Sequence, residues 1–170
     1  MKKTSGVPIE SRLHLDPKGK HNGNEAKYVL EALDSENPKN KEVPWARRFE
    51  SAFAAKFGIH YAIAHNSGTS TLHSCLAAAG VGAGDEVIVP AQTVIMCGWA
   101  ALYQNAIPVY ADSDPDTFNI DPKDVEKKIT SKTKAIIAVH MHGLPSDVDT
   151  ILAMASKRGI SVVEDCAQCV

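Results

Sequence analysis

From residue 61 onward, short apolar runs alternate with amphipathic segments, and this alternation most constrains the fold. The apolar runs are continuous, as expected of strands buried on both faces of a parallel sheet. The predicted strands are 61–64, 86–89, 107–110, 134–140 and 160–163. The predicted helices between them are 68–79, 94–103, 121–129 and 146–157. The sequence therefore predicts an α/β fold with a mainly parallel sheet sandwiched by helices.

Residues at the ends of these segments support the predicted boundaries. Asp121 is expected to cap a helix whose first residue is Pro122, a position that tolerates the missing N–H of proline. Ser146 is the expected cap of the helix over 146–157. Gly159 is expected to close that helix.

The first third of the chain has a different pattern. Residues 1–22 are polar and without periodicity, so we expect an N-terminal arm. A helix is predicted over 24–33, starting from Asn24 as cap. A second is predicted over 45–57, with phenylalanines at four-residue spacing, and Gly58 is expected to end it.

Charge and hydropathy exclude several classes of protein. The net charge of −2 gives no electrostatic reason to expect nucleic acid or an anionic membrane as partner. The longest apolar stretch, 94–103, is about half of what a membrane-spanning helix needs and predicts a buried helix. The basic N-terminus lacks the apolar core of a signal peptide. We therefore expect a cytoplasmic protein.

A turn of small residues opens the predicted helix over 68–79. It reads Asn-Ser-Gly-Thr-Ser-Thr over 66–71. Helix N-termini present free N–H groups and the positive end of the helix dipole, which suit a phosphate. Gly68 permits close approach, and Ser67 and Thr69 add hydroxyl donors. An ordinary helix cap is the alternative.

A carboxylate follows the last predicted strand. Asp165 stands where ligands bind in open α/β sheets, at the carboxyl end of a strand. Such a carboxylate can hold a ring nitrogen in its protonated form, and Gln168 could then reach a ring hydroxyl. Together with the phosphate turn, this pattern indicates pyridoxal phosphate. The alternative is that Asp165 caps a following helix.

Histidines and cysteines near the strand ends leave further interpretations open. His140 and His142 could contact a ligand or transfer a proton, although a structural role suits them better, and Glu164 is expected to face away from Asp165. The pair Cys166 and Cys169 has the CxxC form, which allows a redox or zinc site. The other interpretation is that both cysteines are small residues beside a cofactor.

Taken in order, five segments resemble the N-terminal part of a sugar aminotransferase of the DegT/StrS type. The segments are HNSGT (65–69), GAGDEVIVP (82–90), DP (121–122), HMHGLPSDVD (140–149) and VEDCAQ (163–168). Each motif alone is weak, whereas their order and spacing are specific. The resemblance extends over 23–170 and implies part of the large, pyridoxal-phosphate-binding domain of a fold-type-I enzyme, incomplete here.

The resemblance also implies roles for individual residues. Ser67, Gly68 and Thr69 would hold the cofactor phosphate, Asp165 the pyridine nitrogen and Gln168 the ring hydroxyl. It implies a homodimer that moves an amino group from an amino acid, glutamate in the usual reaction of the family, to a nucleotide-linked keto sugar. Products of this class serve surface polysaccharides or related sugar biosynthesis.

The chain departs from the family pattern at the cofactor ring. Where the family often stacks an aromatic side chain on the pyridine, this chain has Val94. Valine offers less contact area, and Trp99, further along the same helix, is expected in the core rather than on the ring.

A second departure concerns the Schiff-base lysine, which the family carries beyond the Asp165 segment. The chain stops at Val170, so we expect a fragment without that lysine or the C-terminal domain, inactive alone. No catalytic residue is therefore assigned here. The alternatives are a pyridoxamine-phosphate-dependent sugar dehydratase, in which histidine replaces the lysine, a non-catalytic fragment, and a CxxC thiol or zinc protein.

Overall fold

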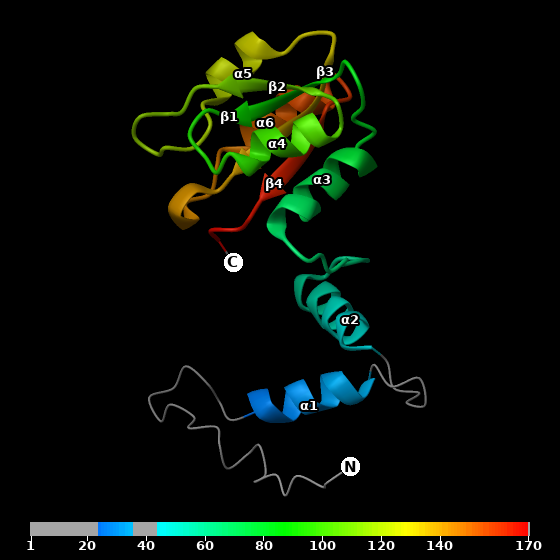
Figure 1. Cartoon of the computed structure of the whole chain (residues 1–170). Helices are drawn as coiled ribbons and strands as arrows, with labels where there is room; N and C mark the ends of the chain where they lie inside the picture. The colour runs from blue at the N-terminus through cyan, green and yellow to red at the C-terminus, as the bar shows by residue number, and fades with distance from the viewer. Residues whose placement is uncertain (1–23, 36–43, 170) are drawn as a thin grey trace, which may run out of the picture. The chain divides into compact units, whose positions relative to one another are not determined.

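The computed structural model describes residues 24–35 and 44–169 (Figure 1). The chain divides into two compact units between Ala64 and His65, and each unit is described by itself. The predicted arm over 1–22 lies outside the described residues.

The first unit contains two helices, as the sequence predicts. They are α1 (Glu25–Ser35) and α2 (Trp45–Phe57). Gly58 ends α2 in the left-handed conformation, with φ of 65°, and its N–H bonds to the carbonyl of Ala54. A residue without Cβ adopts this conformation at little cost, which explains why the helix stops there.

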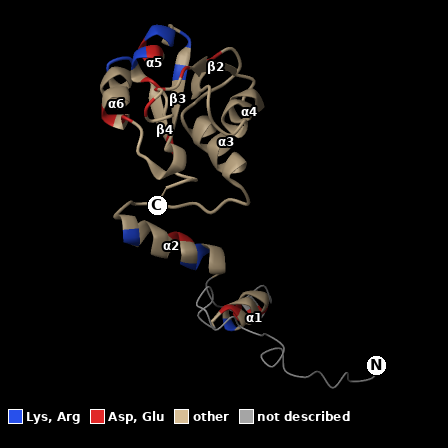
Figure 2. Ribbon diagram, turned by 90° about the vertical axis from the view of Figure 1, so that its left-hand side faces the viewer, with Lys and Arg blue, Asp and Glu red and all other residues tan. Residues whose placement is uncertain are grey.

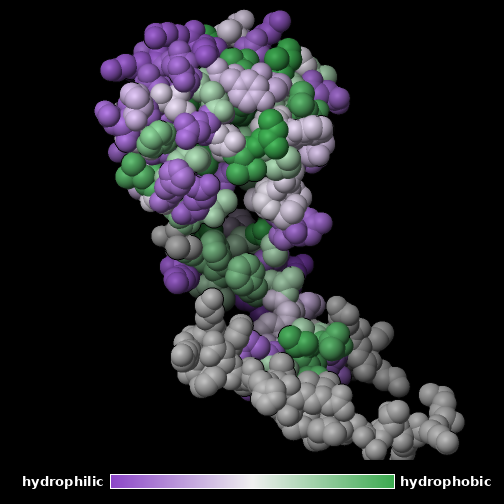
Figure 3. Space-filling model, turned by 60° about the vertical axis from the view of Figure 1, so that its left-hand side comes forward, coloured by the Kyte–Doolittle hydropathy of each residue, from purple (hydrophilic) through white to green (hydrophobic). Residues whose placement is uncertain are grey.

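Aromatic side chains connect α1 and α2 and extend along α2. The rings of Tyr28 and Trp45 lie 5.3 Å apart, and the Arg48 guanidinium stands 3.9 Å from the centre of the Trp45 ring. Phe53 contacts both Phe49 and Phe57, with ring centroids 5.8 and 4.5 Å away. All three phenylalanines are exposed, and Figure 3 shows apolar side chains on the surface of α2.

The predicted strand over 61–64 is wrong. Tyr61 is 86% exposed and Ile63 74% exposed, and no strand in the described ranges pairs with them. The backbone N–H of Ala64 instead donates to the Glu50 carboxylate at 2.9 Å. An apolar run becomes a strand only where a neighbouring backbone completes its hydrogen bonds, and a local pattern does not report that neighbour.

The second unit is built on a parallel sheet of four strands, which confirms the other four predicted strands. They are β1 (Glu86–Pro90), β2 (Ile107–Ala111), β3 (Thr133–Val139) and β4 (Ser161–Asp165), in the spatial order β2-β1-β3-β4. All three pairings are parallel, and Val139 at the end of β3 stands opposite Asp165 at the end of β4.

Helices cover both faces of this sheet, which confirms the predicted sandwich. One face packs Val87 and Val89 against α3 (Gly68–Ala78) and α4 (Met96–Tyr103). The other packs Ile88 against α5 (Pro122–Lys128) and α6 (Val148–Ser156). Because successive strand residues point to opposite faces, the central strands need apolar side chains throughout.

The two layers of helices differ in charge. Neither α3 nor α4 carries a charged side chain, whereas Lys, Arg, Asp and Glu gather at α5 and α6 (Figure 2). The apolar helix α4 begins at Met96, two residues later than predicted. Trp99 on α4 is 44% exposed and contacts Tyr103 at 5.9 Å, so its predicted place in the core is wrong. Among the described helices, none is long and apolar enough to cross a membrane.

Helix caps agree with the sequence at α5 but not at α6. Asp121 caps α5, and its carboxylate accepts the N–H of Lys123 at 2.9 Å. At α6 the cap is Asp147, not the predicted Ser146. The Ser146 hydroxyl is buried and donates to the carbonyl of Val139 at 2.7 Å. Because that hydroxyl completes the end of β3, the next residue caps the helix.

Candidate functional site

The carboxyl ends of the four strands meet at one edge of the sheet, because all pairings are parallel. Asp165 ends β4, and the loop 91–95 follows β1 at the same edge. Figure 1 shows the first turn of α3 on the side of the unit toward which β4 points. The sequence-predicted site residues therefore come from three segments at this edge.

The first turn of α3 is a capped helix start. Ser67 has extended backbone, and its hydroxyl accepts the N–H of Ser70 at 3.2 Å. The Ser70 hydroxyl donates toward Asn66 Oδ1 at 2.7 Å, so it serves the turn itself. The N–H groups of Gly68 and Thr69 precede the first helical hydrogen bonds and have no acceptor inside the helix. The ordinary cap is present, and it leaves two amides for an anion.

The surroundings of Gly68 fit a phosphate group. A Cβ placed on Gly68 meets no atom within 4 Å, so open space lies beside this backbone. Ser67 and Gly68 are exposed, and Thr69 is half-buried. A ligand oxygen could approach the two amides there, and an added methyl group would stand in that space.

Two neutral groups contact the carboxylate of Asp165, and a third supports one of them. Its Oδ1 accepts the N–H of Ala167 at 3.0 Å, and its Oδ2 lies 3.7 Å from the thiol of Cys97. Thr93 Oγ1 lies 3.6 Å on the other side of that sulfur. Burial raises the pKa of Cys97 to about 11, so at neutral pH its thiol keeps the proton that it donates to Asp165. A turn over 167–168, rather than a helix, follows Asp165.

The charge of Asp165 has no cationic partner within residues 24–35 and 44–169. No Lys, Arg or His nitrogen of these ranges lies within ion-pair distance of its carboxylate. Each carboxylate oxygen can accept two hydrogen bonds, and each accepts one here. Among the described residues, the Asp165 carboxylate therefore has no cation beside it and keeps open acceptor positions, which suit a protonated ring nitrogen.

Gln168 is held by a short 3₁₀ turn, η2 (Met141–Gly143). Its Oε1 accepts the N–H of His142 at 2.6 Å, and its backbone oxygen lies 3.3 Å from where a Cβ on Gly143 would stand. His142 and Gly143 both have positive φ, 55° and 82°. Since Oε1 is engaged, the side-chain NH₂ group is the donor that Gln168 can offer to a ring oxygen.

Val94 lies in the loop before α4 and is 58% exposed. The Thr93–Cys97–Asp165 contacts connect this loop to the end of β4. The structure thus places the loop that contains Val94 next to Asp165. It places Gln168 next to η2. Within the described residues, no hydrogen bond joins the first turn of α3 to Asp165. Contact of Val94 with a cofactor ring stays a prediction.

Two residues that organise this edge were not predicted to do so. The sequence places Cys97 only in a buried helix, and its contact with Asp165 joins residues 68 positions apart. Buried Asn119 donates to the carbonyls of Leu144 and Pro145 at 3.1 and 3.2 Å, and it accepts the N–H of Met141 at 2.9 Å. It thereby fixes the segment after η2, and the sequence around it carries no signal of this role.

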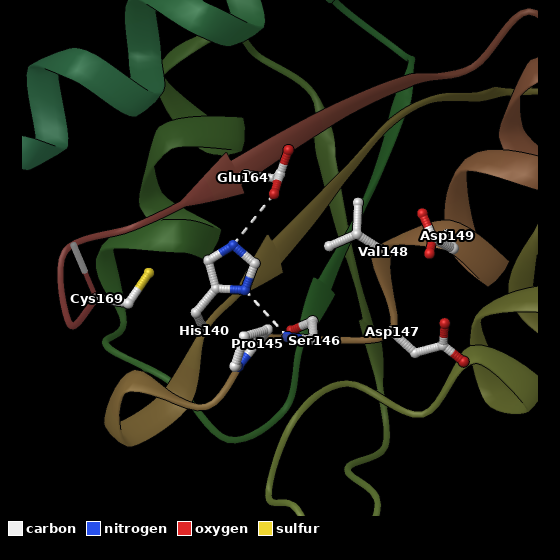
Figure 4. A pocket seen from close by; sticks show the side chains of 8 residues that line it. All are labelled: His140, Pro145, Ser146, Asp147, Val148, Asp149, Glu164 and Cys169. Carbon is white, nitrogen blue, oxygen red and sulfur yellow. Dashed lines mark hydrogen bonds and ion pairs between the residues drawn. The ribbon is translucent and has the colours of Figure 1, made fainter. Parts of the chain in front are cut away.

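His140 has the structural role that the sequence favours. It is 5% exposed; its Nδ1 accepts the N–H of Ser146 at 3.0 Å, and its Nε2 lies 3.2 Å from Glu164 (Figure 4). Glu164 contacts His140 while Asp165 contacts Cys97 of α4, so the two carboxylates point apart as predicted. An open pocket of about 390 Å³ lies beside this pair, lined by His140, Pro145, Ser146, Asp147, Val148, Asp149, Glu164 and Cys169.

Comparison with known proteins identifies the family to which this chain belongs. Residues 20–170 match the model of the DegT/DnrJ/EryC1/StrS aminotransferase family. The chain belongs to this family. This confirms the resemblance that the sequence motifs indicate, and with it the family's aminotransferase character.

Three similar proteins illustrate the match. GDP-perosamine synthase of Escherichia coli O157:H7 is 42% identical over 146 residues, 86% of this chain and 40% of that protein. L-Glutamine:2-deoxy-scyllo-inosose aminotransferase of Streptomyces paromomycinus is 44% identical over 122 residues, 72% of this chain and 29% of that protein. The solved structure of NtdA from Bacillus subtilis with bound cofactor PMP has a TM-score of 0.78 and 33% identity, covering 99% of this chain and 38% of NtdA.

These matches confirm the expected fold, and they show that the chain corresponds to only part of each relative. The structural neighbours are aminotransferases with the predicted fold-type-I architecture, and NtdA contains bound pyridoxamine phosphate. The chain spans about two fifths or less of the length of the relatives that it matches.

Proposed function

We propose that this chain is the cofactor-binding part of a pyridoxal-phosphate-dependent aminotransferase acting on a keto sugar. The observation that carries the proposal is Asp165, whose charge no cation of the described residues matches. Membership of an aminotransferase family supports the same reading. A carboxylate at a strand end with open acceptor positions is the group that a pyridinium N–H requires.

The residues present fit the cofactor at both of its ends. Ser67, Gly68 and Thr69 would hold the phosphate, Asp165 the ring nitrogen, and Gln168 the ring hydroxyl, with Val94 against the ring face. When bound, pyridoxal phosphate supplies an electron-withdrawing ring that stabilises negative charge at the reacting carbon. The chain's own contribution is to position that ring and keep its nitrogen protonated. We assign no catalytic residue to residues 1–170.

The neutral donors around Asp165 matter for this role. Cys97 and the N–H of Ala167 fix the orientation of the carboxylate without neutralising its charge. A cation in their place would compete with the ring nitrogen. A hydrogen bond to a charged group contributes about 1.5–3 kcal/mol, more than a neutral one.

Substrate and amino donor extend the proposal further. We propose a nucleotide-linked keto sugar and glutamate, in a cytoplasmic homodimer that serves surface polysaccharide or related sugar biosynthesis. The GDP-perosamine synthase relative supports the nucleotide sugar. The name of the inosose aminotransferase relative gives a different substrate, 2-deoxy-scyllo-inosose, and L-glutamine as its co-substrate. The complete protein should be assayed with both substrate types and both donors; amination of only the inosose would reject the nucleotide sugar.

Binding of pyridoxamine phosphate tests the cofactor site in this chain alone. This ligand carries no aldehyde, so it does not react with surface lysines. We expect it to bind the wild-type chain and to bind Asp165→Asn about tenfold more weakly, as loss of a charge-assisted bond predicts. Titration calorimetry measures both affinities.

A matched control separates the two faces of β4. Glu164→Gln removes the neighbouring carboxylate, which points away from Asp165, and should leave the affinity unchanged. Inorganic phosphate should compete with the ligand if the first turn of α3 holds the phosphate group. Equal affinities of the wild-type chain and Asp165→Asn would reject the assignment of Asp165.

A further inference from the structure

The turn from Cys166 to Cys169 contains two thiols that the proposed function does not use. The N–H of Cys169 donates to the carbonyl of Cys166 at 3.1 Å, which closes a four-residue turn. In such turns the first and fourth Cα atoms lie within about 7 Å, and a disulfide spans Cα separations of about 4.4–6.8 Å. The backbone of this turn is therefore compatible with a disulfide.

The two sulfur atoms already lie close together. The Sγ atoms of Cys166 and Cys169 and a ring nitrogen of His140 all lie within 4.8 Å of one another. Both cysteines are free; Cys166 is exposed and Cys169 half-buried, so a soluble oxidant reaches the pair. Bringing the sulfurs to the roughly 2.05 Å of a disulfide needs side-chain rotation and a small change in the turn.

We propose that Cys166 and Cys169 form a reversible disulfide that makes the Gln168 turn sensitive to redox conditions. With oxidised glutathione as oxidant, the more exposed Cys166 attacks one of its sulfurs and releases one glutathione thiol. Cys169 then attacks the mixed disulfide and releases the second. Two protein thiols become one disulfide, and one oxidised glutathione becomes two reduced molecules.

The surroundings of His140 favour a disulfide over a zinc ion bound by the same three residues. Nδ1 of His140 accepts the N–H of Ser146, so the ring proton resides on Nε2, facing Glu164. A metal bound to Nε2 requires that the ring proton move to Nδ1. The Nδ1–H and the N–H of Ser146 would then be two donors facing each other, without an acceptor. Zinc binding would thus break a buried hydrogen bond, whereas oxidation of the thiols leaves His140 unchanged.

Gln168 lies inside the turn that the disulfide would tighten. Its Oε1 accepts the N–H of His142, and its backbone oxygen packs against Gly143. Closing the sulfur pair moves the backbone on both sides of Gln168, so the 2.6 Å bond to His142 is the contact expected to change. Because the proposed function has Gln168 contact the cofactor ring, oxidation should also weaken cofactor binding; this last step rests on that proposed function.

Mass spectrometry of the chain in glutathione buffers tests the disulfide directly. In oxidised glutathione we expect the wild-type chain to lose two hydrogen atoms and to yield a peptide linking Cys166 to Cys169. Cys75→Ser, the matched control outside the turn, should behave the same. Cys166→Ser and Cys169→Ser should lack the internal disulfide and retain a glutathione adduct. Adducts on the wild-type chain without the internal disulfide would overturn the proposal, as would one zinc ion per purified chain that protects both thiols.

Two further readouts separate the disulfide from its effect on the cofactor. The amide resonance of His142 should shift on oxidation of the wild-type chain but not of Cys169→Ser; an unchanged resonance would reject the coupling to Gln168. Pyridoxamine phosphate should bind the reduced chain several-fold more tightly than the oxidised chain. Equal binding in both states would overturn the effect on the cofactor. Absence of binding in both states would reject the proposed function, while the mass measurement still decides the disulfide.

Discussion

The thiol of Cys97 orients the carboxylate of Asp165 through a hydrogen bond. This buried thiol lies 3.7 Å from Oδ2 of Asp165 and 3.6 Å from Thr93 Oγ1, so it connects the loop before α4 to the end of β4. The two partners are 68 positions apart in the chain, which explains why no local pattern pointed to the contact. Cys97 is thus a positioning residue for the carboxylate.

Substituting Cys97 should weaken cofactor binding according to the donor that remains. Cys97→Ala removes the donor to Asp165, and we expect pyridoxamine phosphate to bind about threefold to tenfold more weakly, as loss of one hydrogen bond predicts. Cys97→Ser keeps a donor and should bind nearly as the wild type does. Calorimetry gives the affinities, and urea unfolding gives the stability of each variant. Equal weakening in both variants would point to packing rather than the hydrogen bond.

The thiol of Cys166 should react faster as the pH rises. Burial, Cys169, and the nearby carboxylates Glu164 and Asp165 raise its pKa to about 11; His140 is the other titratable neighbour. Below the pKa the thiolate fraction grows about tenfold per pH unit, so the oxidation rate should grow similarly between roughly pH 7 and 9. Thiol titration against time measures this rate at each pH. A plateau by pH 8 would contradict the raised pKa.

Local patterns were sufficient for most secondary-structure elements. Apolar periodicity and end residues such as Gly58 and Pro122 located the helices, because these signals act within a few residues. The strand predicted over 61–64 failed because strand formation depends on a partner strand. The cap of α6 moved to Asp147 because the hydroxyl of Ser146 bonds to β3, a contact that the sequence does not show.

A substitution at the start of α3 should change ligand affinity without lowering the stability of the fold. Gly68 does not have positive φ, and an added Cβ meets no atom within 4 Å. Gly68→Ala should therefore leave the free energy of unfolding unchanged or raise it by up to about 1 kcal/mol, because alanine favours helix. The methyl group would occupy the space proposed for the phosphate, so pyridoxamine phosphate should bind at least several-fold more weakly.

Gly82→Ala is the matched control for this substitution. Gly82 also lacks positive φ and has open space at its Cβ, but it lies in the turn before β1. It should change neither cofactor affinity nor, beyond a few tenths of a kcal/mol, stability. If Gly68→Ala binds the ligand as tightly as Gly82→Ala does, the phosphate is not held at this turn.

At the scale of the whole molecule, the apolar core belongs to the second unit. Both core clusters lie between Leu72 and Ile160, on the two faces of the sheet. Helix α2 of the first unit, in contrast, has no buried residue. Every residue proposed to hold the cofactor lies within 67–168, so the site and the core share one unit.

Residues 65–170 should therefore fold and bind without the first unit. Each face of the sheet buries several Val, Ile or Leu side chains, and each contributes about 1.5–3 kcal/mol. We expect the shortened chain to unfold cooperatively in urea and to bind pyridoxamine phosphate within about twofold of the full chain. The shortened Asp165→Asn variant should lose affinity by the same factor as the full-length one. A chain of 65–170 that unfolds without cooperativity would show that the first unit completes the core, and the two-unit division would then not mark an independent folding boundary.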